Sequence, residues 1–271
     1  MSYKLTIPGP VGIADMCFKD HNKRQLFEIS PARNRERALA AKPAGNFIYN
    51  GSNWEPQAYE GFAVVSMLSE NEENIPLAER LIEIQNELKY NLSPTHGFYL
   101  LPPESFHQTV ANTLSAERFK EHILDAGLED EYPDIVANAF EQIAIWESEE
   151  PIMMKMAGLS IFGTAIGILG VFENEEDYNR IVSFRSGFYS DEQLAQLDIK
   201  MTRPFIGHIT LAYIEQNLTK NQKDHLIDVV SEINESLARQ DNYFFISGTG
   251  LRRYHHLAEF IKQDNYPVYQ F

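Results

Sequence analysis

The chain has 271 residues, 44% of them hydrophobic and 12% aromatic, which is enough to bury the core of one large domain or two small ones. Its formal net charge of −16 disfavours tight binding to long nucleic acid, and its single cysteine, Cys17, excludes an internal disulfide and a cysteine-based zinc cage. One cysteine also favours a reducing, cytoplasmic setting. No apolar run is long enough to span a bilayer and residues 1–8 lack the apolar core of a signal peptide, so we expect no membrane partner.

Residues 1–58 show no clear helix or strand period and hold eight Lys/Arg against five Asp/Glu. A short helix is expected around residues 33–42, followed by a turn at Asn50-Gly51. We interpret residues 1–58 as an extension that packs on a main body formed by residues 59–271. The alternative is a strap over the active site, in which Tyr49 or Trp54 stacks on a base.

The main body alternates strand and helix patterns along its length. Apolar runs predict strands at residues 61–68, 99–101, 105–110, 152–159, 165–172 and 205–214. Apolar residues at helical spacing predict helices at residues 76–90, 119–124, 135–145, 175–184, 191–197 and 220–237. Residues 243–247 and 250–260 are expected to form a closing hairpin. Because the order strand, helix, motif strand occurs twice, the sequence predicts one α+β domain with two lobes.

Two short motifs carry the chemistry, His107-Gln108-Thr109-Val110 and His208-Ile209-Thr210-Leu211. Each lies in a predicted strand. Side chains alternate between the two faces of a strand, so each histidine and the threonine two residues later point the same way. The motifs can therefore present two imidazoles and two hydroxyls to one small anion. The alternative is a pair of strand histidines that are satisfied by backbone partners.

This layout resembles the 2H phosphoesterase superfamily, which is named for two His-x-Thr/Ser-x motifs with an apolar last position. The stretches at residues 156–171 and 251–260 are also similar to the bacterial RNA ligase/cyclic phosphodiesterase branch, and the resemblance covers residues 59–271. It implies a bilobal fold with two antiparallel sheets lining a central cleft and helices outside. Gln108 departs from the family pattern, which more often has an apolar residue there. Since Gln108 points away from the expected cleft, we expect it to affect packing more than chemistry.

The resemblance implies a phosphodiesterase that acts on a 2′,3′-cyclic or related phosphodiester and needs no metal or cofactor. Opening such a diester requires a base for the attacking water and an acid for the leaving oxygen, and histidine titrates near neutrality. We assign His208 as the base and His107 as the acid, roles that the reverse reaction exchanges. Thr109 and Thr210 are expected to donate hydrogen bonds to the non-bridging oxygens.

Four further residues are candidates for substrate binding. Arg203, five residues before His208, is expected to approach the phosphate, with a surface ion pair as the alternative. Tyr99, Phe162 and Trp54 are candidates for stacking on a base, with packing on the protein itself as the alternative. The other histidines show no metal-ligand spacing, and we expect surface positions for His21, His96, His122 and His225.

An enzyme is favoured over two other functions. A binding module that senses a nucleotide without turnover has no need to keep histidine and threonine at both motifs. A ligase or transferase at RNA ends is disfavoured because the acidic surface repels a large RNA. The expected partner is therefore a small nucleotide or an RNA end, and the sequence predicts no oligomeric state.

Overall fold

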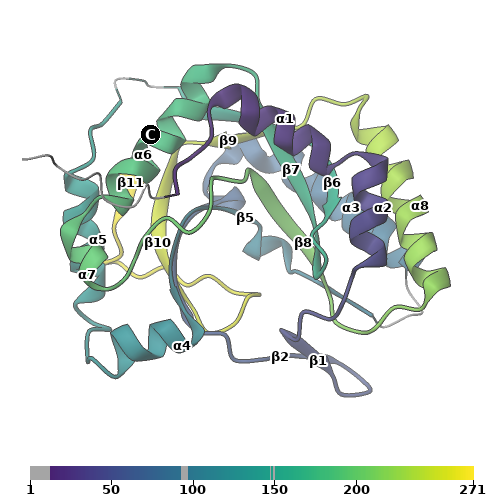
Figure 1. Ribbon diagram of the computed structural model, residues 1–271, viewed down its shortest axis with the longest axis horizontal. Helices are drawn as coiled ribbons and strands as arrows, with labels where there is room; N and C mark the ends of the chain where they lie inside the picture. Colours follow the sequence, from purple (N-terminus) through teal and green to yellow (C-terminus); the bar gives the residue numbers. More distant parts are fainter. Residues whose placement is uncertain (1–12, 93–96, 147, 149) are drawn as a thin grey trace, which may run out of the picture.

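The computed structural model describes residues 13–92, 97–146, 148 and 150–271 (Figure 1). One antiparallel sheet consists of β3 (Gly61–Met67), β5 (His107–Ser115), β10 (Gly248–Tyr254) and β11 (Val268–Gln270), in the order β11-β10-β3-β5. A second consists of β4 (Phe98–Leu100), β6 (Ile152–Ile161), β7 (Ala165–Phe172), β8 (His208–Ile214) and β9 (Tyr243–Ile246), in the order β4-β8-β7-β6-β9. The predicted α+β class with two antiparallel sheets is confirmed.

The helices lie outside the two sheets (Figure 1). Those that pack around the five-stranded sheet are α1 (Phe18–Glu28), α2 (Pro31–Leu39), α3 (Ile75–Leu92) and α8 (Lys220–Leu237). Those around the four-stranded sheet are α4 (Ala116–Phe119), α5 (Tyr132–Glu141), α6 (Glu175–Tyr189) and α7 (Glu192–Gln196), and α6 also contacts β6 and β7. Each helix and strand predicted between residues 61 and 237 has a counterpart in the structure. The one predicted at residues 119–124 corresponds to a π-helical segment, Lys120–Leu124, that follows α4, and α8 has the predicted ends.

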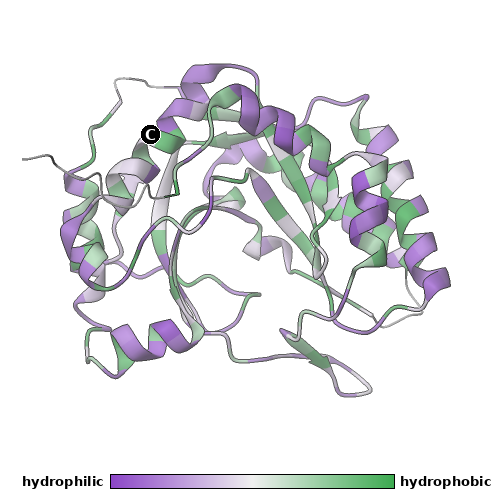
Figure 2. Cartoon of the chain, viewed as in Figure 1, coloured by the Kyte–Doolittle hydropathy of each residue, from purple (hydrophilic) through white to green (hydrophobic). Residues whose placement is uncertain are grey.

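Helix α8 illustrates why these segments fold where they do. It begins with a capping box, in which the Thr219 hydroxyl accepts from Gln222 N and the Gln222 side chain accepts from Thr219 N. Leu226, Val230 and Ile233 form one buried stripe at helical spacing, and the helix packs on β6. Figure 2 shows the outcome for the whole molecule, with hydrophobic residues concentrated along β6, β7 and β8 and hydrophilic residues on the outside of α1 and α2.

The two large sheets are built alike around the motif strands. β5 pairs with β3, which pairs with β10, and β8 pairs in the same way with β7, which pairs with β6. β5 is the edge strand of its sheet, and it contacts β8 of the other sheet. The fold therefore joins its two halves at the strands that carry the two histidines.

The predicted closing hairpin is wrong. β9 pairs with β6 in the five-stranded sheet, whereas β10 pairs with β3 in the four-stranded sheet, so the chain crosses between the sheets at Ser247. The common hairpin loops contain two or more residues, and Ser247 alone separates β9 from β10. β10 also ends at Tyr254, well before residue 260, and it pairs with β11, a strand that the sequence did not predict.

Residues 13–58, the described part of the extension, form two helices and a small sheet. α1 contacts β7, α2 contacts α8, and β1 (Phe47–Tyr49) pairs with β2 (Trp54–Pro56). The turn between these strands contains Gly51 at φ +96°, as the Asn50-Gly51 signal predicts. α2 overlaps the helix expected at residues 33–42. α1 was not predicted because the residues it buries are His21 and Gln25, which give no apolar period.

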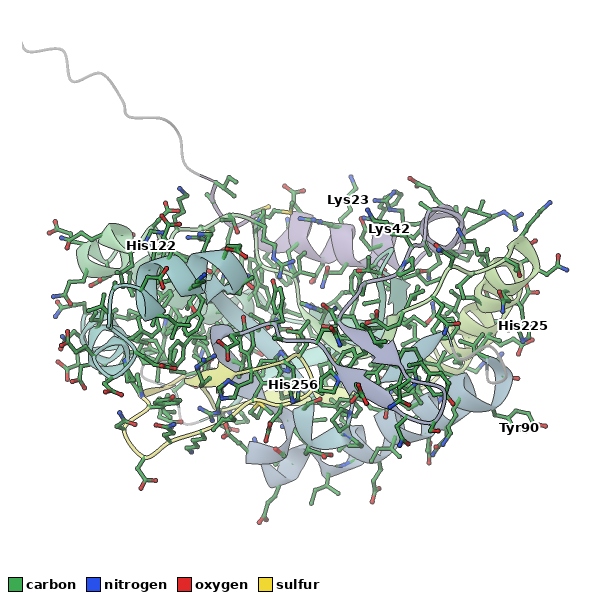
Figure 3. The ribbon with its side chains drawn as sticks, turned by 90° about the horizontal axis from the view of Figure 1, so that it is seen from below. Lys23, Lys42, Tyr90, His122, His225 and His256 are labelled. Carbon is green, nitrogen blue, oxygen red and sulfur yellow. The ribbon has the colours of Figure 1, made fainter. Side chains whose placement is uncertain are left out.

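His21 is buried, so the surface position expected for it is wrong. Its side chain is 1% exposed and lies against the rings of Phe172, Tyr178 and Phe205. His225 is exposed and His122 partly so, at opposite ends of the molecule (Figure 3). His96 and residues 1–8 lie outside the described residues. Within the described chain, no helix combines the length and the apolar character needed to cross a bilayer.

Replacing His21 by phenylalanine is expected to make the fold less sensitive to acid. Burial lowers the pKa of His21 from 6.5 to about 4. Stability that depends on the neutral ring is complete above pH 6.5 and is lost as the pH falls through 4, an effect of about 3 kcal/mol. Urea unfolding at pH 7 and pH 4 measures it: the wild-type protein should lose about 3 kcal/mol more than His21→Phe. Equal losses in the two proteins would contradict the prediction.

Candidate active site

The motif residues form a partly exposed face on two neighbouring strands. Along β5, His107 and Thr109 are partly exposed and Gln108 is buried, and along β8 His208 and Thr210 are partly exposed. This confirms the alternation expected of each motif. The two imidazoles are close enough for His208 to contribute to lowering the pKa of His107. The structure therefore brings the four predicted catalytic residues together.

Each imidazole is oriented by the backbone carbonyl two residues before it. His107 Nδ1 lies 2.7 Å from Ser105 O, and His208 Nδ1 lies 3.0 Å from Ile206 O. A carbonyl oxygen only accepts hydrogen bonds, so Nδ1 carries the proton in both rings and Nε2 of each neutral ring has a lone pair. Backbone partners thus satisfy one nitrogen of each histidine, and Nε2 is the atom that can face a substrate.

The threonine hydroxyls lie on the same strand faces as the imidazole rings. Thr109 and Thr210 share the partly exposed faces of His107 and His208. Within the described part of the chain, neither hydroxyl has a hydrogen-bond partner, so each is able to donate to an oxygen of a bound anion.

An aromatic ring flanks each histidine. The Phe162 ring lies edge-on to His208 with the ring centroids 5.5 Å apart, and the Phe260 ring lies 4.0 Å from the centroid of His107. Phe162 follows β6 and Phe260 lies beyond β10, which are corresponding strands of the two sheets. Phe162, a candidate for stacking on a base, therefore adjoins His208. Phe260 was missed because residue 260 was placed at the end of a strand that stops at Tyr254.

Both histidines are held neutral at physiological pH. Burial lowers the pKa of His107 and of His208 from 6.5 to about 4, although each bond to a backbone carbonyl acts in the opposite direction. The positive charge of Arg203 contributes to the low pKa of His208. The unliganded site therefore presents two basic nitrogen atoms and no imidazolium near pH 7.

A buried ion pair fixes the loop that leads into β8. Arg185 Nε lies 2.8 Å from a carboxylate oxygen of Asp15, whose second oxygen accepts from Phe205 N. The same guanidinium donates to Val110 O, at the end of the first motif, and to Arg203 O at 2.9 Å. Arg185 thereby links Val110, the last residue of the first motif, to the loop that precedes the second motif. Sequence reasoning missed this pair because no local pattern links two residues so far apart.

Arg203 lies near His208, as its effect on that ring indicates. Desolvation and the charges of Arg185 and Arg24 lower the pKa of Arg203, but a guanidinium remains charged at any physiological pH. Among the described residues, Arg203 and Arg24 form no ion pair, although the chain is strongly acidic. Arg24 on α1 was not predicted as a site residue. Its only signal was the basic character of residues 1–58.

Tyr99 and Trp54 come together at a different place. They line a cavity of about 410 Å³ with Leu88 and Lys89, and neither motif histidine lines it. Another lining residue, Ala212, is four positions after His208 on β8, which corresponds to about 13 Å along the strand. The Tyr99 ring also stacks on Phe47 with centroids 3.6 Å apart. These two predicted substrate-binding residues are thus separate from the group around His208.

Comparison with known proteins fits this geometry. Residues 50–164, which include the first motif, match the family model 2H-phosphodiest, described as a domain of unknown function (DUF1868). No curated protein matches the chain.

The chain is similar to several solved structures. The conserved protein of unknown function ATU0111 from Agrobacterium tumefaciens strain C58 has a TM-score of 0.59 and 16% identity, covering 89% of this chain and 97% of its own. TT0787 of Thermus thermophilus has a TM-score of 0.40 and 15% identity, covering 77% and 93%. The first of these shares the fold. The family match over residues 50–164 and the position of both His-x-Thr-x motifs on contacting strands agree with the resemblance to the 2H phosphoesterase superfamily.

Proposed function

We propose that this chain is a metal-independent phosphodiesterase that opens a cyclic phosphodiester, of the 2′,3′ type, on a small nucleotide or an RNA end. The observation that supports it most is the paired presentation of two imidazoles in the same tautomer on contacting strands. Two nitrogen atoms of this kind supply a proton acceptor and a proton donor on opposite sides of one phosphorus atom. The match of residues 50–164 to the 2H-phosphodiest family model supports phosphoesterase activity in general.

The proposed reaction needs one imidazolium as the proton donor, whereas both imidazoles of the unliganded site are neutral. A bound phosphodiester anion favours protonation of the nearby rings, so the liganded site gains one imidazolium, which we assign to His107. His208 Nε2 takes a proton from water as the water oxygen bonds to phosphorus. The bond from phosphorus to the leaving ribose oxygen breaks, and that oxygen takes the proton from His107 Nε2. The product is a phosphomonoester, and the two rings have exchanged proton states.

The reaction also requires groups that stabilise the negative charge of the phosphate. The hydroxyls of Thr109 and Thr210 are proposed to donate to the non-bridging oxygens, where negative charge increases in the transition state. Arg203 and Arg24 are proposed to attract the substrate anion to an otherwise acidic molecule, because neither guanidinium is neutralised by a carboxylate within the described residues.

A substrate panel in the presence of excess chelator tests the proposal. It should contain 2′,3′-cyclic nucleotides, 3′,5′-cyclic nucleotides, ADP-ribose cyclic phosphate and 2′,5′-linked dinucleotides. We expect hydrolysis of a 2′,3′-type ring to a phosphomonoester, undiminished by chelator, with a bell-shaped pH dependence of kcat/KM. Turnover that stops in chelator and returns with added metal would reject the mechanism. Binding without hydrolysis across the panel would favour a nucleotide-sensing module.

A further inference from the structure

The buried side-chain amide of Gln108 joins the two motif strands. Gln108 is 0% exposed, and its Nε2 donates to Thr109 O at 2.7 Å and to Ile206 O at 3.1 Å. Its Oε1 accepts from the backbone N–H of His208 at 2.5 Å. Both donors and the acceptor of the amide are therefore used, and the side chain takes the place of a peptide unit between β5 and β8.

This bridge makes the two histidines unequal. Ile206 O accepts from Gln108 Nε2 and also from His208 Nδ1, whereas within the described residues Ser105 O accepts from His107 Nδ1 alone. A carbonyl that already accepts one hydrogen bond is a weaker acceptor for a second donor that shares it. The His208 ring consequently receives less stabilisation of its protonated form than the His107 ring does.

We propose that Gln108 is a positioning residue that sets the two motif strands against each other and makes His208 the proton acceptor and His107 the proton donor. The assignment of roles rests on the proposed function, whereas the effect of Gln108 on the two rings does not. The charged and titratable groups that act on the rings are Arg203 for His208 and His208 for His107, and substitution of Gln108 leaves both in place.

Gln85 provides a matched control. It is also buried, at 6% exposure, and its Nε2 also bridges two backbone carbonyls, those of Leu101 and Leu211, at 2.7 and 2.8 Å. Gln85→Met therefore removes a similar bridge at Leu211, in the middle of β8, without touching a histidine or its carbonyl. An effect of Gln108→Met that Gln85→Met lacks cannot arise from lost packing alone.

The test is an NMR titration of the histidine rings in protein with ¹⁵N-labelled histidine, with signals assigned from His107→Ala and His208→Ala. In Gln108→Met the pKa of His208 is expected to rise by about 0.5 to 1 relative to that of His107, because Ile206 O then accepts from the ring alone. In Gln85→Met neither pKa should move. If Gln108→Met does not fold, Gln108→Leu replaces it, since an aliphatic side chain likewise has no donor for Ile206 O, and the same rise is expected.

The titration requires no substrate, so it separates the two proposals. Unchanged ring titrations in folded Gln108→Met or Gln108→Leu would overturn the inference about Gln108, even if the enzyme hydrolyses a cyclic diester. A shifted His208 titration without turnover of any diester would support the coupling and reject the proposed function. Where turnover is found, the acid limb of the pH profile should move to higher pH in Gln108→Met by the same amount as the His208 titration.

Discussion

Replacing either motif histidine by alanine is expected to lower kcat/KM on the cyclic diester by about 10²- to 10⁴-fold. Each ring supplies one of the two proton transfers, and both Nε2 atoms are available because Nδ1 is engaged by a carbonyl. The two rings act as a unit, so the double variant should be little worse than the poorer single variant. The measurement is steady-state hydrolysis of the substrate found in the panel.

A stability control distinguishes lost chemistry from lost folding. His107 and His208 are partly exposed, so truncation should change the melting temperature little. His225→Ala is the matched control, because His225 is exposed and lies at the edge of the molecule (Figure 3). It should leave both activity and melting temperature unchanged. Hydrolysis that persists in His107→Ala and in His208→Ala would exclude two-histidine catalysis.

Much of this site follows from local patterns that the sequence displays. The alternation of β5 and β8 places each histidine with its threonine, since the period of two belongs to the strand itself. The paired strands around Gly163 form as expected, because that glycine adopts φ +87° in the turn. Such features depend on neighbours in the chain and need no knowledge of the tertiary fold.

The features that were missed depend on contacts between distant residues. The Gln108 bridge to His208 and the Arg185–Asp15 pair each join segments that only the complete fold brings together. The failed hairpin has the same cause. The segments at residues 243–247 and 250–260 have strand composition, but their partners are β6 and β3, which compete successfully with pairing to each other. Gln108 also shows that a polar residue can occupy a fully buried position when its donors and its acceptor are all hydrogen-bonded.

The second large effect expected is on anion binding, which should strengthen as the pH falls. Burial places the pKa of both free histidines at about 4, so the unliganded site is neutral at pH 7. A bound anion stabilises imidazolium and raises these pKa values. At pH values between the pKa of a histidine in the free site and its pKa in the anion-bound site, each anion binds together with a proton. The Kd for the anion then falls by up to about tenfold for each unit decrease in pH. Below pH 4 the free rings are already protonated and the affinity should level off.

Sulfate is the suitable probe, because it does not titrate between pH 7 and pH 4.5. Isothermal titration calorimetry in two buffers of different ionisation enthalpy gives both the Kd and the number of protons taken up. The double variant His107→Ala/His208→Ala supplies the baseline, since the net charge of −16 becomes less negative in acid and favours any anion. The wild-type slope should exceed this baseline by up to one logarithmic unit per pH unit for each proton. Equal slopes in the two proteins would mean that the imidazoles do not face the anion, and the proposed chemistry would lose its proton donor.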